Sequence, residues 1–169
     1  EEEDFSAFSR APLPGVTYAG MMEYDGDLHV PRSYLVSPPS IDDTVGERMA
    51  AAGLTVMSIS ETQKFGHVTF FFNGNRSAAM DGETWTEVPS EVVPFDQHPQ
   101  MSADEVTDKA CEAITSGAFD HVRINIANGD MVGHTGVLAA TVSAMEVVDA
   151  CVGRLETAVR AAGGVRLIT

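Results

Sequence analysis

The residues best suited to chemistry are a carboxylate and an imidazole that lie close together in the chain. Asp130 and His134 are separated by three residues, in a stretch that Gly133 and Gly136 punctuate. Both side chains are ligand types for a divalent transition metal. Taken alone, the Asp-x-x-x-His spacing is a weak signal, so its structural setting has to decide whether it marks a metal site.

The segment just before this pair is predicted to be a strand. Residues 122–126 alternate between apolar and polar and are rich in β-branched side chains. Asn128 and Gly129 then break the pattern and predict a turn. A loop between a strand and a helix is where open α/β sheets place their ligands, beyond the carboxyl ends of the strands. We therefore expect Asp130 and His134 on a loop at one edge of a sheet.

The rest of the chain predicts an α/β fold, with helices flanking a mainly parallel sheet. Residues 68–72 are apolar on both faces, which is typical of an interior strand. The strands are expected, in chain order, at residues 54–60, 68–72, 85–88, 122–126 and 165–169. Those at 54–60, 122–126 and 165–169 should share one parallel sheet.

Three helices are expected, one before the first of these strands and two between later ones. A short one at residues 44–52 would be capped by Asp42 or Asp43 and closed by Gly53. A second opens at the capping box formed by Ser102 and Glu105. The third, between Gly136 and Gly163, should bury a stripe made of Leu138, Val142, Met145, Val148, Val152, Leu155 and Val159.

The amino-terminal part of the chain has a different character. Residues 1–8 read as the acidic, solvated end of a helix, and residues 16–24 lead into Asp25-Gly26, a hairpin signal that predicts a returning strand at 28–30. Residues 31–39 hold three prolines and predict an extended linker. Both ends of the chain look cut, so we expect an internal fragment of a longer protein.

Composition excludes some functions. The formal charge is −15, which makes nucleic acid and anionic membranes unfavourable partners. Hydrophobic residues make up 44%, enough for a core, and no apolar run approaches the roughly 20 residues of a membrane span. Cys111 and Cys151 both sit at apolar positions of helical patterns, which favours free thiols in a reducing, cytoplasmic setting over a disulfide.

Two long stretches carry a resemblance to a known family. Residues 61–77 (ETQKFGHVTFFFNGNRS) and 128–136 (NGDMVGHTG) resemble motifs of the cofactor-independent phosphoglycerate mutases, members of the alkaline phosphatase superfamily. Residues 18–22, 24–26 and 34–39 look most like the plant and trypanosomatid branch. The resemblance runs in order along nearly the whole chain.

The resemblance implies an enzyme that interconverts 3-phosphoglycerate and 2-phosphoglycerate through a phosphoserine, without a bisphosphoglycerate cofactor. It implies two divalent metal ions, usually Mn²⁺, with Co²⁺ or Mg²⁺ as alternatives. The family's aspartate and histidine ligands match Asp130 and His134, and Lys64 matches a lysine that contacts the phosphoryl group or the serine. Phosphoryl transfer depends mainly on charge neutralisation and positioning, which metals and a lysine supply.

Parts of the family pattern are absent from this sequence. The nucleophilic serine, the remaining metal ligands and the substrate-binding arginines are missing, and Ser58 and Ser60 belong to no matching motif. The comparison places residues 1–34 at the carboxyl-terminal tail of the phosphotransferase domain and the start of a linker. It places residues 35–169 in the central part of the metal-binding, phosphatase-like domain, truncated at both ends. We expect the isolated fragment to be inactive and the parent enzyme to be a cytoplasmic monomer.

Less specific interpretations remain. The chain could belong to another phosphomutase or a phosphatase of the same superfamily, or be a non-catalytic module with a degenerate site. Lys64 without the family match would be an ordinary solvated lysine, and His67 is expected to be a packed histidine. His29, His98 and His121 lack partners at ligand spacing and are expected to be structural or superficial. The roles of Asn73, Asn75 and Arg76 stay open.

Overall fold

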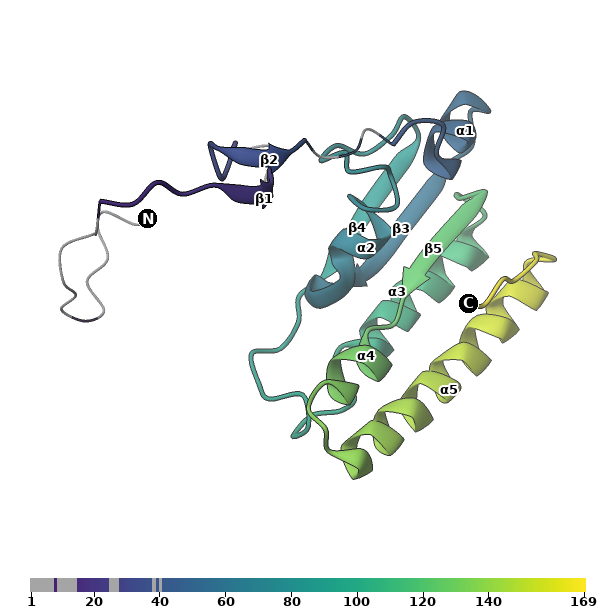
Figure 1. The fold of residues 1–169 in the computed structure, drawn as a ribbon. Helices are drawn as coiled ribbons and strands as arrows, with labels where there is room; N and C mark the ends of the chain where they lie inside the picture. The colour runs from purple at the N-terminus through teal and green to yellow at the C-terminus, as the bar shows by residue number, and fades with distance from the viewer. Residues whose placement is uncertain (1–7, 9–14, 25–27, 38, 40) are drawn as a thin grey trace. The chain divides into compact units, whose positions relative to one another are not determined.

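The computed structural model describes residue 8 and residues 15–24, 28–37, 39 and 41–169 (Figure 1). The chain divides into two compact units, residues 1–39 and residues 40–169, which are treated separately here. The expected acidic helix end at residues 1–8 and the Asp25-Gly26 turn lie almost entirely outside the described residues. Among the helices of the described part, none is both long and apolar enough to span a membrane.

The first unit contains a small two-stranded sheet. Strands β1 (Gly20–Met22) and β2 (Tyr34–Val36) run parallel, with Gly20 opposite Tyr34 and Met22 opposite Val36. The predicted hairpin is therefore wrong in its pairing, because β1 takes its partner from the stretch that we read as linker. The aromatic and β-branched residues of β2 favour a strand despite the prolines around it. Within residues 28–30, the Val30 carbonyl accepts a hydrogen bond from the Tyr24 amide at 2.9 Å.

The second unit is built on a parallel three-stranded sheet with the order β4-β3-β5. The strands are β3 (Val56–Glu61), β4 (Glu83–Val88) and β5 (His121–Asn125). Ser58 at the centre of β3 lies opposite Trp85 of β4 and Arg123 of β5. The predicted parallel arrangement is confirmed for β3 and β5, and β4 takes the third place in the sheet. The carboxyl ends of the three strands meet at one edge of the sheet.

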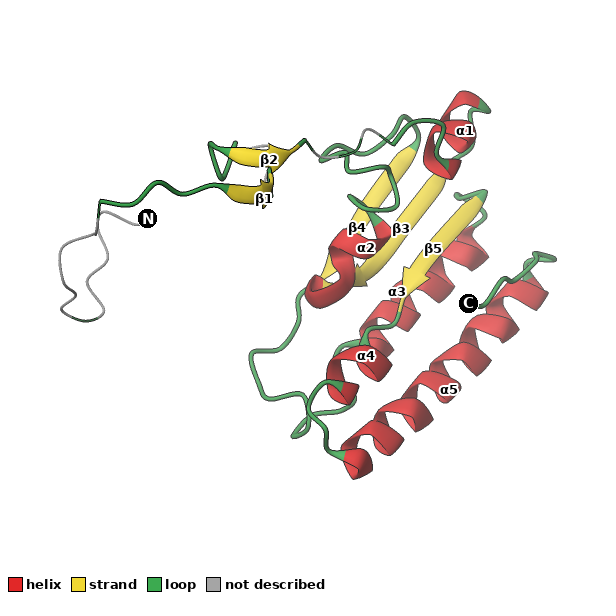
Figure 2. Ribbon diagram, viewed as in Figure 1, coloured by secondary structure: helices red, strands yellow, loops and turns green. Residues whose placement is uncertain are grey.

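Helices lie on both faces of this sheet (Figure 2). Helix α3 (Ala103–Ser116) packs against β3 and β5, and α5 (Leu138–Ala161) packs beside α3. The apolar core between sheet and helices includes Met57, Ile59, Val88, Val106, Ala110 and Leu155. The short helix α2 (Phe65–Val68) lies over the opposite face of the sheet, against β3 and β5. The α/β class with flanking helices is confirmed.

The predicted strand at residues 68–72 is wrong. A 3₁₀ helix, η1 (Thr62–Lys64), directly follows β3, and α2 follows η1. Residue 68 is the last residue of α2, and residues 69–72 form turns. Its polar groups bond locally: the Thr69 hydroxyl donates to the Phe65 carbonyl at 2.7 Å, and the Asn73 amide donates to the Thr69 carbonyl at 2.9 Å. An apolar run without turn residues fits a helical turn as well as a strand, and here the local hydrogen bonds decide.

The predicted strand at residues 165–169 is also wrong. Among the described residues these five pair with no strand, and the side chains of Val165 and Leu167 are 98% and 89% exposed. A strand exists only through its ladder partners, so a strand-like pattern without a partner stays irregular. An ion pair of 2.9 Å between Arg166 and Glu156 joins this segment to α5.

The buried stripe of α5 differs from the predicted one. Its inward residues are mostly small: Ala140, Ala144, Cys151, Leu155 and Ala158. Leu138, Val142 and Met145, which were expected inside, are 77%, 50% and 50% exposed. Small side chains let α5 approach α3 and α4 closely, so they decide which face turns inward.

The helix starts are capped by other residues than expected. Helix α1 (Val45–Ala51) is capped by Thr44, whose side chain forms a capping box with Glu47, rather than by Asp42 or Asp43. Ser102 precedes α3 but makes no side-chain cap; its amide donates to Glu61 Oε2 at 2.8 Å instead. Gly53, Gly117 and Gly163 take positive φ angles after their helices, as expected.

Candidate metal and phosphate site

Asp130 lies on a short helix, α4 (Asn128–Gly133), that begins almost directly after β5, and His134 is the C-cap residue of this helix. The expected turn at Asn128 and Gly129 is therefore wrong, because these residues form the first turn of α4. Asn128 is fully buried, and its amide group donates to the carbonyls of Pro99 and Gln100 at 2.8 and 2.7 Å. This anchor holds the start of α4 in place beyond the sheet.

The helical geometry places the two candidate ligands on one face. Residues four apart in a helix are neighbours on its surface. His134 Nε2 is 3.4 Å from Asp130 Oδ1, and the His134 side chain is 75% exposed. The carboxylate and the imidazole therefore share one open side of α4.

Lys64 reaches the same carboxylate from the neighbouring strand. It ends the 3₁₀ helix η1, directly after β3, and its ammonium forms an ion pair with Asp130 Oδ2. The Lys64 side chain is only 17% exposed, whereas that of Asp130 is 51% exposed. Because β3 and β5 are adjacent and parallel, the structure brings all three predicted site residues together at the carboxyl edge of the sheet. Their roles in metal and phosphate binding stay predictions.

The electrostatics keep Asp130 ionised. The hydrogen bond from Lys64 is the largest cause that lowers the pKa of Asp130, and the charges of Lys64, His134 and His67 act in the same direction. The Asp130 carboxylate is half exposed and already paired with Lys64, so it is not a buried charge without a partner.

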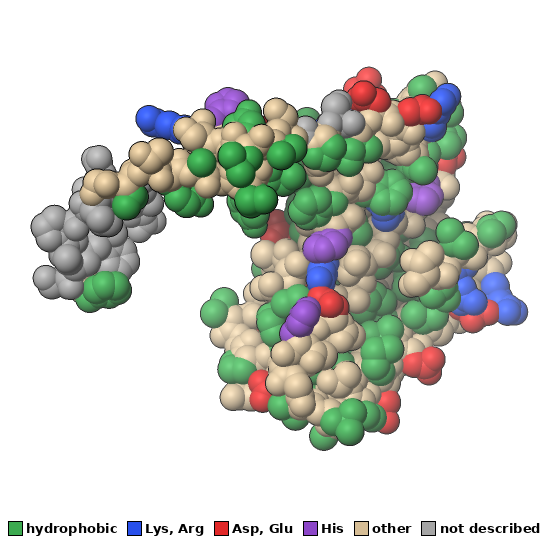
Figure 3. Space-filling view, viewed as in Figure 1, with side chains coloured by type: hydrophobic (Ala, Val, Ile, Leu, Met, Phe, Trp, Pro, Cys, Tyr) green, Lys and Arg blue, Asp and Glu red, His purple; other side chains and the backbone are tan. Residues whose placement is uncertain are grey.

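His67 borders this cluster, although the sequence suggested a packed core histidine. Its side chain is exposed, and its ring meets the Phe71 ring edge-on, with centroids 5.5 Å apart. His67 stands three residues after Lys64, so both follow β3 on the same helical segment. The Lys-x-x-His spacing in the sequence could have pointed to it. Figure 3 shows histidine, basic and acidic side chains gathered together on this face.

Arg76 and Asn73 form their contacts with other residues of the protein. Arg76 Nη2 pairs with Glu47 Oε1 at 2.9 Å, and Arg76 Nη1 donates to the Asn73 carbonyl at 2.9 Å. Asn73 is fully buried, and its side-chain amide donates to Glu83 at 2.6 Å. These contacts tie the segment after α2 to α1 and to β4.

The donor set is suitable for a divalent metal but incomplete. Asp130 offers a carboxylate oxygen and His134 an imidazole nitrogen, both common ligands of Mn²⁺, Co²⁺ or Zn²⁺. Among the described residues, however, His, Cys, Asp and Glu form no group of three or more that could hold a metal ion. Catalytic metal sites usually have three protein ligands. Asp130 and His134 by themselves therefore fall short of such a site.

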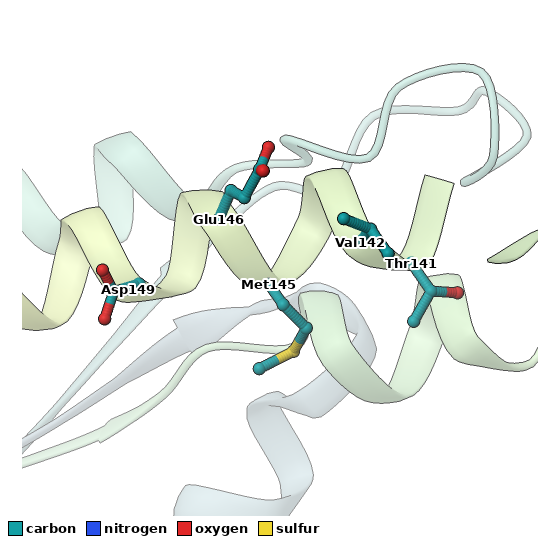
Figure 4. A pocket seen from close by; sticks show the side chains of 5 residues that line it. All are labelled: Thr141, Val142, Met145, Glu146 and Asp149. Atoms are coloured by element: carbon teal, nitrogen blue, oxygen red, sulfur yellow. The ribbon is translucent and has the colours of Figure 1, made fainter. Parts of the chain in front are cut away.

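A shallow hollow lies elsewhere on the surface, along α5. Thr141, Val142, Met145, Glu146 and Asp149 line it, and all five come from this one helix (Figure 4). It is open and includes none of the three candidate site residues. We assign no function to it.

Comparison with known proteins shows the family of the chain. The family model described as the metalloenzyme superfamily matches residues 15–169. The chain therefore belongs to the metalloenzyme superfamily.

Within that superfamily, its relatives are 2,3-bisphosphoglycerate-independent phosphoglycerate mutases. The one from Trypanosoma brucei brucei is 52% identical over 171 aligned positions, covering 100% of this chain and 31% of that protein. A probable one from Arabidopsis thaliana is 49% identical over 172 positions, with the same coverage of 100% and 31%. The resemblance seen in the sequence is thus confirmed, and the chain spans about a third of the length of these relatives.

A solved structure shares the fold. A phosphoglycerate mutase from Leishmania mexicana, described at low cobalt concentration, superimposes with a TM-score of 0.84 at 49% identity. The match covers 97% of this chain and 30% of that protein. This agreement confirms the α/β assignment.

Proposed function

We propose that this chain supplies part of the active site of a phosphoglycerate mutase that interconverts 3-phosphoglycerate and 2-phosphoglycerate through a phosphoserine. The observation that carries the proposal is the meeting of Lys64, Asp130 and His134 at one edge of the sheet. Relatives about half identical to the chain are phosphoglycerate mutases, which supports this reaction over others of the superfamily.

Each residue has a chemical task in the proposal. Asp130 and His134 hold one divalent ion, for which we propose Mn²⁺; the relative's structure with cobalt supports a transition metal. An ion bound there would supply Lewis-acid stabilisation of phosphoryl oxygens. Lys64 neutralises charge on the transferring phosphoryl group and is held in place by its partly buried side chain.

The remaining parts of the site lie outside what this chain offers. The second metal ion, the nucleophilic serine and the substrate arginines have no matching residues here. We propose that residues 35–169 form the central part of a metal-binding, phosphatase-like domain, and that residues 1–34 end a phosphotransferase domain. The phosphorylated substrate would approach an acidic chain, so the local positive charge of Lys64 matters for binding.

We further propose a cytoplasmic, monomeric parent enzyme that binds neither nucleic acid nor membrane. Cys111 and Cys151 are both free thiols in the structure, which supports a reducing compartment. The formal charge of −15 disfavours both polyanionic partners. No specific observation favours a different superfamily enzyme or a non-catalytic module. A substrate screen of the complete protein would separate these alternatives from the mutase.

The test is an enolase-coupled assay with added Mn²⁺ on the 169-residue chain and on a complete protein that contains it. We expect negligible mutase and phosphatase activity for the 169 residues, and full activity for the complete protein. Asp130→Ala or His134→Ala should abolish that activity. Asp149→Ala, which removes an exposed carboxylate of α5, is the matched control and should stay active.

Two results would contradict the proposal. Turnover by the 169 residues at the rate of the complete protein would show that the active site has been misplaced. An active His134→Ala variant of the complete protein would show that the Asp-x-x-x-His motif has been misread.

A further inference from the structure

A buried ion pair crosses the middle of the sheet on the face that α2 covers. Arg123 of β5 pairs with Glu83 of β4, and their side chains are only 8% and 2% exposed. Ser58 of the intervening strand β3 joins them: it accepts from Arg123 Nη2 at 2.6 Å and donates to Glu83 Oε1 at 2.7 Å. Three strands are thus linked through charged and polar side chains.

The same pair holds the segment after Lys64. We call residues 64–73, from Lys64 to Asn73, the lysine arm. Arg123 Nε donates to the Val68 carbonyl at 2.8 Å, and the guanidinium lies 3.6 Å from the centroid of the Phe72 ring. Glu83 Oε2 accepts from the Asn73 side chain at 2.6 Å. Contacts at Val68, Phe72 and Asn73 therefore hold the lysine arm against the sheet.

Stability alone gives a weak reason for such a pair. Burying two charges is costly, and well-packed apolar residues often serve a fold equally well. Burial acts to raise the pKa of Glu83, but the hydrogen bonds from Ser58, Met80 and Asn73 outweigh it and lower the pKa, so the carboxylate stays charged. The pair instead fixes the orientation of the groups that it binds, because a guanidinium donates its hydrogen bonds along fixed axes.

We propose that Arg123 and Glu83 are positioning residues that set the distance between Lys64 and Asp130. Arg123 lies on β5, the strand that leads to Asp130. Its side chain forms a hydrogen bond to the lysine arm, which begins at Lys64. One residue thereby couples the two sides of the candidate site. The meaning of this distance for phosphoryl transfer rests on the function proposed above; the coupling itself is structural.

The first test needs no activity. Amide hydrogen exchange is measured on the 169-residue chain and on Arg123→Lys, which keeps a cation beside Glu83 but loses the fork. We expect exchange at Phe71 and Asn73, whose amides bond within the lysine arm, to quicken by about tenfold. Exchange in α3 should not change.

Leu155→Ala is the matched control, because it removes a core side chain that packs against the other face of the sheet. It should loosen α3 and leave the lysine arm as protected as before. If Arg123→Lys does not fold, Glu83→Gln replaces it, since glutamine keeps the shape and removes the charge. If the amides of the lysine arm exchange as slowly in a folded variant as in the unaltered chain, the proposal is overturned.

The second test uses the complete, metal-loaded protein. Arg123→Lys should lower kcat by about tenfold or more with little change in KM, because Lys64 acts on the group in transfer. Leu155→Ala, assayed below its melting temperature, should keep kcat. An Arg123→Lys enzyme with unchanged kcat would overturn the positioning role. Failure of the proposed function would show instead as activity that survives Asp130→Ala, with the exchange result unaffected.

Discussion

Lys64 and Asp130 form an ion pair that joins the segment after β3 to the helix after β5. The other oxygen of the same carboxylate lies 3.4 Å from His134 Nε2. One carboxylate thus serves both a fixed cation and a neighbouring imidazole. Any metal ion that binds Asp130 must therefore share this carboxylate with Lys64 or displace the Lys64 ammonium from it.

Replacing Lys64 by methionine should strengthen Mn²⁺ binding by the 169-residue chain. The change removes the cation that competes for Asp130, and an exposed ion pair of this kind corresponds to about a two- to fivefold change in affinity. Titration with Mn²⁺, followed by electron paramagnetic resonance of the free ion, measures the effect. Lys109→Met is the matched control, because Lys109 pairs with Glu105 on the distant helix α3. Weaker Mn²⁺ binding by Lys64→Met would contradict the competition.

The same substitution should raise the pKa of Asp130 toward the ordinary aspartate value. The hydrogen bond and charge of Lys64 now lower that pKa. A lowered folded-state pKa contributes stability that is present above the unfolded-state value and is lost as the pH falls through the folded-state value. The ion pair should therefore break only in acid below the usual aspartate range. Carboxyl carbon NMR of Asp130 against pH measures this, and an unchanged midpoint in Lys64→Met would refute the pairing.

Glu61 should make the fold less stable as the pH rises. Its side chain is 1% exposed, and burial raises its pKa above the usual value of 4.5, despite the hydrogen bond from Ser102. A raised carboxyl pKa means that the folded state holds its proton longer than the unfolded state. The free energy of unfolding therefore falls as the pH rises from about 4.5 through the raised value.

Glu61→Gln should flatten this decline, since glutamine keeps an oxygen for the Ser102 amide. Urea unfolding at several pH values between about 4.5 and 8 gives the free energies. Glu112→Gln, an exposed change on α3, controls for the loss of one charge. Parallel pH profiles for the unaltered chain and Glu61→Gln would show that Glu61 does not titrate in this range.

Gly129 leaves room for the Met145 side chain where α4 meets α5. A Cβ at this position would lie 3.1 Å from the Met145 sulfur, and Figure 4 shows the Met145 side chain leaving α5 on a different side from Glu146. Glycine to alanine in a helix usually gains about 0.5–1 kcal/mol. We expect that gain at Gly153, where nothing lies within 4 Å of an added Cβ.

At Gly129 the contact with Met145 should cancel the gain. In a Met145→Ala background, however, Gly129→Ala should become stabilising, with a coupling free energy of about 0.5–1 kcal/mol. Urea unfolding of the four proteins of this cycle measures the coupling. Equal effects of Gly129→Ala in both backgrounds would mean that Met145 does not limit the approach.

Periodicity in the sequence was enough to predict β3, β5 and both long helices. The residues of β5 alternate, and the glycines after the helices take the expected positive φ angles. The apolar run at residues 68–72 misled because its pattern contains no information about ladder partners. The strand predicted at residues 165–169 failed for the same reason. The inward face of α5 depended on which neighbours its small residues could approach.

The candidate site was predictable in part. Asp130 and His134 stand out by spacing, whereas Lys64 was identified only by resemblance to a family. Arg123 was missed because, on an alternating strand, an arginine reads as solvent-facing. Its burial depends on Glu83, forty residues away in the chain, and on the Val68 carbonyl of α2. Contacts between residues so far apart in the chain produce no periodic pattern in the sequence.

The most direct test of the account is the position of the metal itself. Crystals of a complete protein containing this chain, grown with Mn²⁺, would locate the ion by anomalous diffraction at the manganese edge. The account predicts a manganese ion about 2.0–2.2 Å from an Asp130 carboxylate oxygen and from a His134 ring nitrogen. A fully occupied manganese site with neither residue among its ligands would contradict it.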